Sequence, residues 1–126
     1  MTGHSLRLAT VLTGLLTMVI TTGMPIQSAF GEGGARRDVV RQEKQNIKDA
    51  IEQATEAVNH GKQGHAEKLV THAEASLQLA LKGGESPHLA EAITHLKEAI
   101  EHGKAGHADV ATRRAENAVT HLSQGK

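Results

Sequence analysis

The 126-residue sequence has no cysteine, tryptophan or tyrosine, and only one phenylalanine. Without cysteine there can be no disulfide framework and no thiolate metal site. Without more aromatic residues there is no basis for an aromatic ligand box. The three methionines are Met1, Met18 and Met24, all close to the N-terminus. The rest of the chain therefore has no soft sulfur ligand of the kind that Cu(I) prefers.

The sequence also lacks an excess of charge of either sign, with 14 basic and 14 acidic residues. A net charge of zero argues against nucleic acid or an anionic membrane surface as a partner. Histidine, in contrast, is abundant. The chain has nine histidines, and eight of them lie beyond residue 59. We therefore look for the function in this histidine-rich part.

The N-terminal segment has the features of a secretory signal peptide. Arg7 precedes an apolar run over residues 8–24, which stops at Pro25 and is followed by the small residues Ser28, Ala29 and Gly31. This pattern predicts a signal peptide over residues 1–31, with cleavage near Gly31 and export from the cytosol. A membrane anchor is the alternative, but the run is short and interrupted, whereas a membrane span needs about 20 predominantly apolar residues.

The mature chain is expected to be one small soluble domain. Residues 32–37 are rich in glycine and charge and are predicted to be a linker. Asp38 fits a helix N-cap, and residues 38–126 are predicted to form the domain. No cysteine follows the apolar run to carry a lipid, so we expect no membrane association after the signal is removed.

Histidine returns every seventh position in residues 88–102, at His88, His95 and His102. Apolar residues recur beside it at heptad positions a, d and e, which predicts an amphipathic helix with a core-facing stripe. If histidine is position g, the imidazoles form one column beside this stripe, because residues seven apart drift by only about 20°. Glu91 and Glu98 fall at position c, next to the same column.

The same frame predicts four helices between glycine-containing breaks. The first runs from Asp38 to His60 with Val40 in its apolar stripe, and Gly61 is suited to a left-handed cap. The second runs from His65 to the glycines at 83–84. The third begins at Ser86 and Pro87, and the fourth covers residues 107–122.

The two halves of this region resemble each other. Residues 50–81 share 12 identities in 32 positions with residues 92–123, including the motif HGK-x-GHA at 60–66 and 102–108. The chain thus looks like a duplicated helical hairpin. Short connections between four helices predict an all-α fold, an antiparallel up-and-down four-helix bundle. Its alanine-rich stripes should pack closely but bury little area, which gives modest stability without a ligand.

Eight of the twelve g positions are histidine, too many for chance flanking residues. Neutral imidazole is the commonest protein metal ligand and suits Cu(II), Ni(II) and Zn(II), with Cu(II) favoured by the Irving–Williams order. The candidate metal ligands are His60, His65, His72, His88, His95, His102, His107 and His121. The four carboxylates at position c are interpreted mainly as solvated residues, with a lesser role as extra ligands or as partners that orient an imidazole. They are Asp49, Glu56, Glu91 and Glu98.

An antiparallel bundle sorts these histidines into levels. His60, His65, His102 and His107 share the end with the two glycine-containing loops, so we expect the strongest site there. The neighbours could be either His60 with His65 and His102 with His107, or His65 with His102 and His60 with His107. In the middle, His72 and His95 share a level with Gln53 and Arg114. His88 and His121 share the far end with Asn46 and Leu79.

The periodic histidines, the doubled HGK-x-GH break, the cleavable signal and the lack of cysteine together resemble the small metal-binding protein family of periplasmic histidine-rich four-helix bundles. The likeness covers about residues 38–122. It implies a monomer that binds several divalent metal ions, copper among them, for sequestration or buffering. It also implies that the eight histidines named above are the ligands. The chain departs from the pattern at the g positions Asn46, Gln53, Leu79 and Arg114.

Three other functions fit the sequence less well. An exported helical chaperone or partner-binding scaffold, with incidental histidines, would need an exposed apolar groove. An enzyme is not expected, because no Ser or Cys nucleophile is placed beside a histidine with an orienting acid. A haem protein would lack both a Cys-x-x-Cys-His motif and a methionine ligand in the mature chain.

Overall fold

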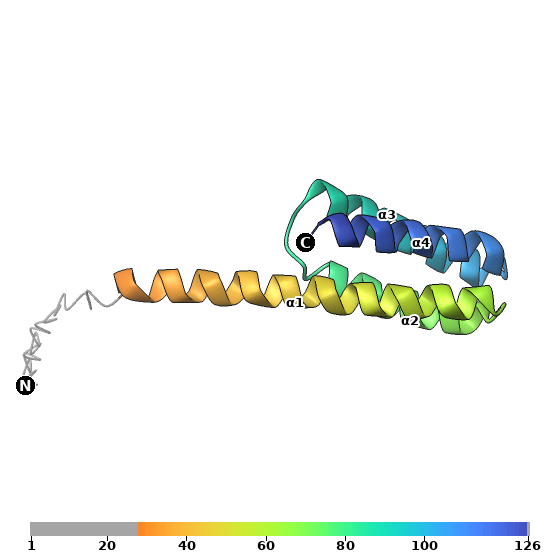
Figure 1. Cartoon of the computed structure of the whole chain (residues 1–126), viewed down its shortest axis with the longest axis horizontal. Helices are drawn as coiled ribbons and strands as arrows, with labels where there is room; N and C mark the ends of the chain where they lie inside the picture. The colour runs from red at the N-terminus through yellow and green to blue at the C-terminus, as the bar shows by residue number, and fades with distance from the viewer. Residues whose placement is uncertain (1–27, 126) are drawn as a thin grey trace, which may run out of the picture.

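The computed structural model describes residues 28–125, which form four α-helices joined by short connections (Figure 1). The helices are α1 (Ser28–Lys62), α2 (Ala66–Ala80), α3 (Pro87–Lys104) and α4 (Ala108–Gln124). The described part of the chain contains no strand, so the predicted all-α four-helix bundle is confirmed. Most of the predicted signal peptide lies outside the described residues. None of the described helices combines the length and the apolar character that a membrane span requires.

The helices are arranged as two hairpins that pack side by side (Figure 1). α1 packs most extensively on α2, and α3 on α4, while α1–α4 and α2–α3 contacts join the two hairpins. In the first hairpin the chain reverses direction. The side-chain amide of Asn46 donates to the carbonyl of Lys82 at 2.8 Å at one end, and the His65 amide donates to the His60 carbonyl at 2.9 Å at the other.

Alanine dominates the core, as the heptad pattern predicts. Ten of the fully buried residues are alanines, and the largest fully buried side chains are Leu69, Leu96 and Leu122. Small side chains let the helices approach closely, so that the Ser76 hydroxyl donates to the Ala50 carbonyl across the α1–α2 contact at 2.7 Å. This bond satisfies a hydroxyl that would otherwise be costly to bury.

α1 begins at Ser28, well before the N-cap predicted at Asp38, and residues 32–37 lie inside this helix. The prediction of a linker with an N-cap at Asp38 is therefore wrong for the local structure. The glycines at 33 and 34 are poor helix formers, but Ala35, Arg36 and Arg37 propagate a helix well. α1 consequently runs past the end of its hairpin partner (Figure 1).

Val40 illustrates the consequence of this overhang. The heptad frame places it in the core stripe, yet it is 48% exposed. From Gly33 onward, where the burial of α1 is described, Asn46 and Ile47 are the first buried residues. The reason is that the partner helix α2 ends at Ala80, near the level of Asn46. The predicted burial of Val40 is wrong, since a heptad pattern marks a helix face but not where the neighbouring helix stops.

The start of α3 is as predicted. Ser86 has an extended conformation, its hydroxyl accepts a hydrogen bond from the Leu89 amide at 3.1 Å, and Pro87 occupies the first helical turn. The first amides of a helix have no partner within the helix, and a serine N-cap accepts a hydrogen bond from one of them. Proline is tolerated in the first turn because the N–H that it lacks would have had no partner there.

Candidate metal centre

The repeated HGK-x-GH motif closes α1 and α3 in the same way. The His65 amide donates to the His60 carbonyl at 2.9 Å, and the Gly64 amide donates to the Gly61 carbonyl at 2.9 Å. These two bonds, with Gly64 at φ +78°, make a Schellman C-cap. The equivalent bonds recur in the second copy of the motif, between His107 and His102 and between Gly106 and Gly103.

The left-handed residue of the cap is therefore Gly64, and the prediction that Gly61 takes this conformation is wrong. Gly61 is helical and buried, and a Cβ there would collide with the side chains of Thr112 and Leu69. The first glycine of the motif is thus required by close packing and the second by backbone conformation.

This cap brings two histidines together at each loop. The ring centroids of His60 and His65 lie 6.0 Å apart, and those of His102 and His107 lie 6.1 Å apart. His65 and His107 are N-cap residues, but neither side chain makes a capping hydrogen bond. Capping of the helix therefore does not occupy their imidazoles, which could bind a metal ion.

The histidines form two rows, one in each hairpin. The α1–α2 row contains His60, His65 and His72, and the α3–α4 row contains His88, His95, His102, His107 and His121. Each close pair of histidine rings among the described residues joins two members of the same row, and none joins the two rows. Of the two arrangements left open by the sequence, the structure has the first, so the four loop-end histidines form two separate pairs.

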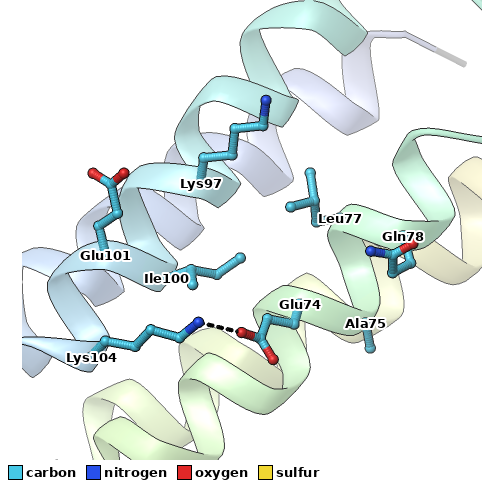
Figure 2. A pocket seen from close by; sticks show the side chains of 8 residues that line it. All are labelled: Glu74, Ala75, Leu77, Gln78, Lys97, Ile100, Glu101 and Lys104. Carbon is cyan, nitrogen blue, oxygen red and sulfur yellow. Dashed lines mark ion pairs between the residues drawn. The ribbon is translucent and has the colours of Figure 1, made fainter.

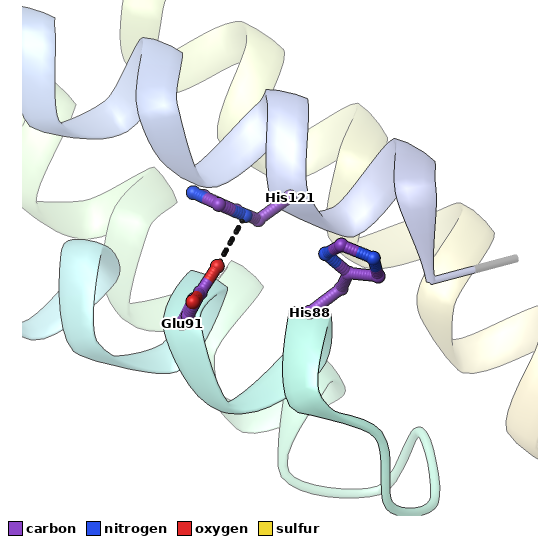
Figure 3. Close-up of side chains that lie close together, drawn as sticks. All are labelled: His88, Glu91 and His121. Carbon is purple, nitrogen blue, oxygen red and sulfur yellow. Dashed lines mark ion pairs between the residues drawn. The ribbon is translucent and has the colours of Figure 1, made fainter.

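The most compact group of donors lies at the opposite end of the bundle, near the α2–α3 connection. His88 and Glu91 on α3 and His121 on α4 each place one ligand atom within 4.8 Å of the other two (Figure 3). Donor atoms about 2.0–2.2 Å from one ion can be at most about 4.4 Å apart. Only a small closure of side chains, two of them exposed, would bring the three atoms to one ion.

His121 is the best-placed ligand of this group. Its Nδ1 is buried and lies 2.8 Å from Glu91 Oε2. The dashed line in Figure 3 marks this ion pair. The contact lacks the alignment of a hydrogen bond, so this nitrogen has no hydrogen-bond partner among the described residues. A buried polar atom without a partner is uncommon and needs an explanation. The two atoms are close enough to pair directly, and they could also act as neighbouring ligands of one cation.

The α1–α2 row has a second unsatisfied nitrogen. His60 Nδ1 is buried without a hydrogen-bond partner among the described residues, and its ring stacks on His72 with centroids 5.2 Å apart. His72 Nδ1 lies 2.9 Å from the Gln53 amide oxygen. This row offers imidazoles and an amide, whereas the α3–α4 row also offers carboxylates.

The middle of the α3–α4 row is occupied by an ion pair. His95 Nδ1 and Arg114 Nη1 both lie 3.2 Å from the same atom, Glu98 Oε2. The His95 ring also stacks on His121, with centroids 5.4 Å apart. His95 is thus close to the compact group, but its carboxylate neighbour already has a cationic partner.

The carboxylates of α3 lie closer to the histidines than the sequence predicts. Glu91 and Glu98 contact histidines, whereas of the other two position-c carboxylates Asp49 accepts a hydrogen bond from Gln45 and Glu56 is exposed. The spacing of three between His88 and Glu91 was the available signal. It could not show that His121 from another helix lies opposite.

A groove between α2 and α3, about 540 Å³ in volume, has no histidine among the residues that line it (Figure 2). Leu77 and Ile100 line it together with charged residues, and Lys104 Nζ pairs with Glu74 Oε1 at 2.7 Å. Among the described residues the large apolar side chains that are exposed are Val39, Val40 and Leu81, which do not line this groove. The groove therefore does not favour a scaffold for apolar segments.

The fold and the site together define a histidine-lined four-helix bundle with a His/Glu group able to hold a metal ion. A profile described as small metal-binding protein matches residues 8–125. This match covers nearly the whole chain, and the chain belongs to the small metal-binding protein family, as its resemblance implied. A search of curated proteins found no match. The family is described by metal binding rather than by a reaction.

Proposed function

We propose that this protein binds divalent transition metal ions in the periplasm and sequesters or buffers them there. The observation that carries the proposal is the buried Nδ1 of His121, which lacks a hydrogen-bond partner among the described residues and sits beside Glu91 and His88. A bound cation would satisfy this nitrogen and the adjacent carboxylate together.

Cu(II) is the ion that the donors favour most, with Ni(II) and Zn(II) also accepted. Imidazole and carboxylate are ligands of borderline to hard character, and a given set of such ligands binds Cu(II) most tightly among these ions. The signal-like residues 1–31, outside or at the edge of the described chain, support export to a compartment where such ions are met.

Partly exposed ligands suit buffering better than permanent storage. His88 and Glu91 are exposed and His121 is partly buried, so an ion held there remains accessible to solvent and to competing ligands. The two loop-end pairs, His60 with His65 and His102 with His107, offer further sites with two imidazoles each.

The proposal is tested by calorimetric titration of the metal-free chain without residues 1–31 with Cu(II), Ni(II) and Zn(II). A variant with His88→Gln, Glu91→Gln and His121→Gln should lose one high-affinity step and keep its helicity. A matched variant with His102→Gln, His107→Gln and Glu101→Gln removes two imidazoles and a carboxylate of the same hairpin, and should retain that step.

The sequence pattern alone points to the loop end as the strongest site, and the same two variants decide between the ends. Loss of the tightest step only in the second variant would place the strongest site at the loops and contradict the assignment to His121. Absence of binding of all three ions by the unaltered chain would contradict the proposed function itself.

A further inference from the structure

Arg114 lies beside His95 and Glu98 in the middle of the α3–α4 row, where it already provides the carboxylate with a cationic partner. Its Nη1 and His95 Nδ1 converge on the same oxygen, Glu98 Oε2, each at 3.2 Å. The His95 side chain is only 21% exposed, so the protein holds it against this carboxylate. The guanidinium thus contacts the same Glu98 oxygen that a metal ion shared with His95 would need.

The internal duplication shows what the position holds in the other hairpin. When the two halves are aligned on their HGK-x-GH motifs, Arg114 corresponds to His72, and His95 corresponds to Gln53. His72 and Gln53 face each other in the α1–α2 row at 2.9 Å, as Arg114 and His95 share one level in the α3–α4 row. Each middle level therefore contains one histidine, but only the α3–α4 level contains a cationic side chain.

We propose that Arg114 is an internal cation that blocks a metal site formed by His95 and Glu98, and so limits the number of ions that the α3–α4 row can hold. This inference rests on the proposed function. Arginine remains charged at any physiological pH, so the block is permanent and does not depend on acidity. It divides the row into a His88–Glu91–His121 site at one end and the His102–His107 pair at the other.

Electrostatics gives the block its strength. A metal ion on Glu98 Oε2 would have to displace the guanidinium or lie close to its positive charge, and either raises the free energy of binding. Arg114 and Glu98 are 39% and 37% exposed, so solvent screening keeps the effect moderate. The block also favours binding at His121. The His121 ring stacks on that of His95, so a divalent ion at His95 would repel an ion bound by His121.

Titration with Zn(II) of the chain without residues 1–31 tests the block with four variants. Arg114→Gln removes the charge and should strengthen one weak binding step about two- to fivefold, the order expected for a partly exposed charge interaction. Arg114→His removes the charge and supplies an imidazole, as the other hairpin does, and should add one bound ion. Arg114→Lys keeps the charge and should bind like the unaltered chain. Arg113→Gln is the matched control on the neighbouring exposed position and should change nothing.

Two further readouts separate a block from a merely structural ion pair. Adding Glu98→Gln to Arg114→Gln should abolish the gain, because the released carboxylate is the new ligand. Raising the salt concentration should shrink the difference between Arg114→Gln and the unaltered chain, since salt screens exposed charges. An ion pair that only stabilised the fold would shift the melting temperature and leave both readouts unchanged.

The block is refuted if Arg114→Gln and Arg114→His both bind the same number of Zn(II) ions as the unaltered chain with the same affinities. In that event the proposed function stands as long as the unaltered chain binds Zn(II). If neither the unaltered chain nor any Arg114 variant binds Zn(II), the block is refuted, and the proposed function is refuted with it only if the unaltered chain also fails to bind Cu(II) and Ni(II).

Discussion

Lys62 Nζ on α1 lies 3.1 Å from Glu116 Oε1 on α4, and the same relationship recurs between their equivalents in the duplication, Lys104 on α3 and Glu74 on α2, at 2.7 Å. Exchanging the two hairpins converts one ion pair into the other. The sequence duplication therefore extends to the packing of the hairpins, which are related by an approximate two-fold operation. Each hairpin supplies one lysine and one glutamate to the contact.

These two lysine–glutamate pairs should help to set the register of the hairpins but contribute little to the free energy of unfolding. Both lysine side chains are more than 60% exposed, so a double-mutant cycle of Lys62→Ala and Glu116→Ala should give a coupling of at most about 1 kcal/mol. Urea denaturation of the two single variants and the double variant measures this. A coupling well above that limit would show that the pair is more important than its exposure suggests.

The two glycines of the HGK-x-GH motif should respond differently to alanine. Gly61→Ala forces a methyl group into Thr112 and Leu69 and should cost about 1–3 kcal/mol or more. Gly64→Ala has open space but a φ of +78°, so it should cost about 1–2 kcal/mol from backbone strain alone.

Metal titration distinguishes these two variants further. Gly64→Ala should loosen the cap that joins His60 to His65 and weaken binding at that pair, while the His88–Glu91–His121 group should be unaffected. Denaturation followed by circular dichroism measures the stability of each variant. Equal, negligible losses of stability in both would contradict the separate roles of packing and conformation.

Metal ions should stabilise the fold. An ion that binds only the folded chain contributes about 2.7 kcal/mol when its free concentration is 100 times the dissociation constant. The melting temperature should therefore rise with added Zn(II) and fall back on addition of a chelator. A melting temperature that is independent of Zn(II) would mean that the ion does not bind the folded bundle in preference to the unfolded chain.

Acidification should release the bound metal. Coordination needs a neutral imidazole, and an imidazole in water takes up its proton near pH 6.5, so protons compete with the ion as the pH falls from about 7 to about 5. Equilibrium dialysis across this range measures the loss. Ions that stay bound at pH 4 would indicate carboxylate ligands and assign the histidines a bystander role.

Much of the fold followed from the heptads, because residue spacing of seven fixes which side of each helix is buried. Ala92, Leu96 and Ala99 lie in the core as this spacing predicts. The heptads could not determine which flanks meet, since the pattern is the same whichever way a bundle turns. The pairing of His60 with His65 therefore had to come from the structure.

The candidate ligands were predictable as a set, but their grouping into a candidate site was not. Histidines at position g mark a line on each helix, and the structure places all eight in two rows. The contact between Glu91 and His121 depends on the level of α4 against α3 and on side-chain rotamers, neither of which a single sequence specifies. The exposure of Val40 has a similar origin, because it depends on where α2 ends.

The most direct test follows the imidazole nitrogens themselves. Long-range ¹H–¹⁵N spectra of the protein, recorded during titration with Zn(II), report which ring nitrogens become ligands. We predict that His121 and His88 shift with the first equivalent, that the loop-end pairs shift next, and that His95 stays unchanged while Arg114 is present. First shifts confined to other histidines, or no change in any imidazole nitrogen as the ion binds, would contradict the assignment of the metal centre to His88, Glu91 and His121.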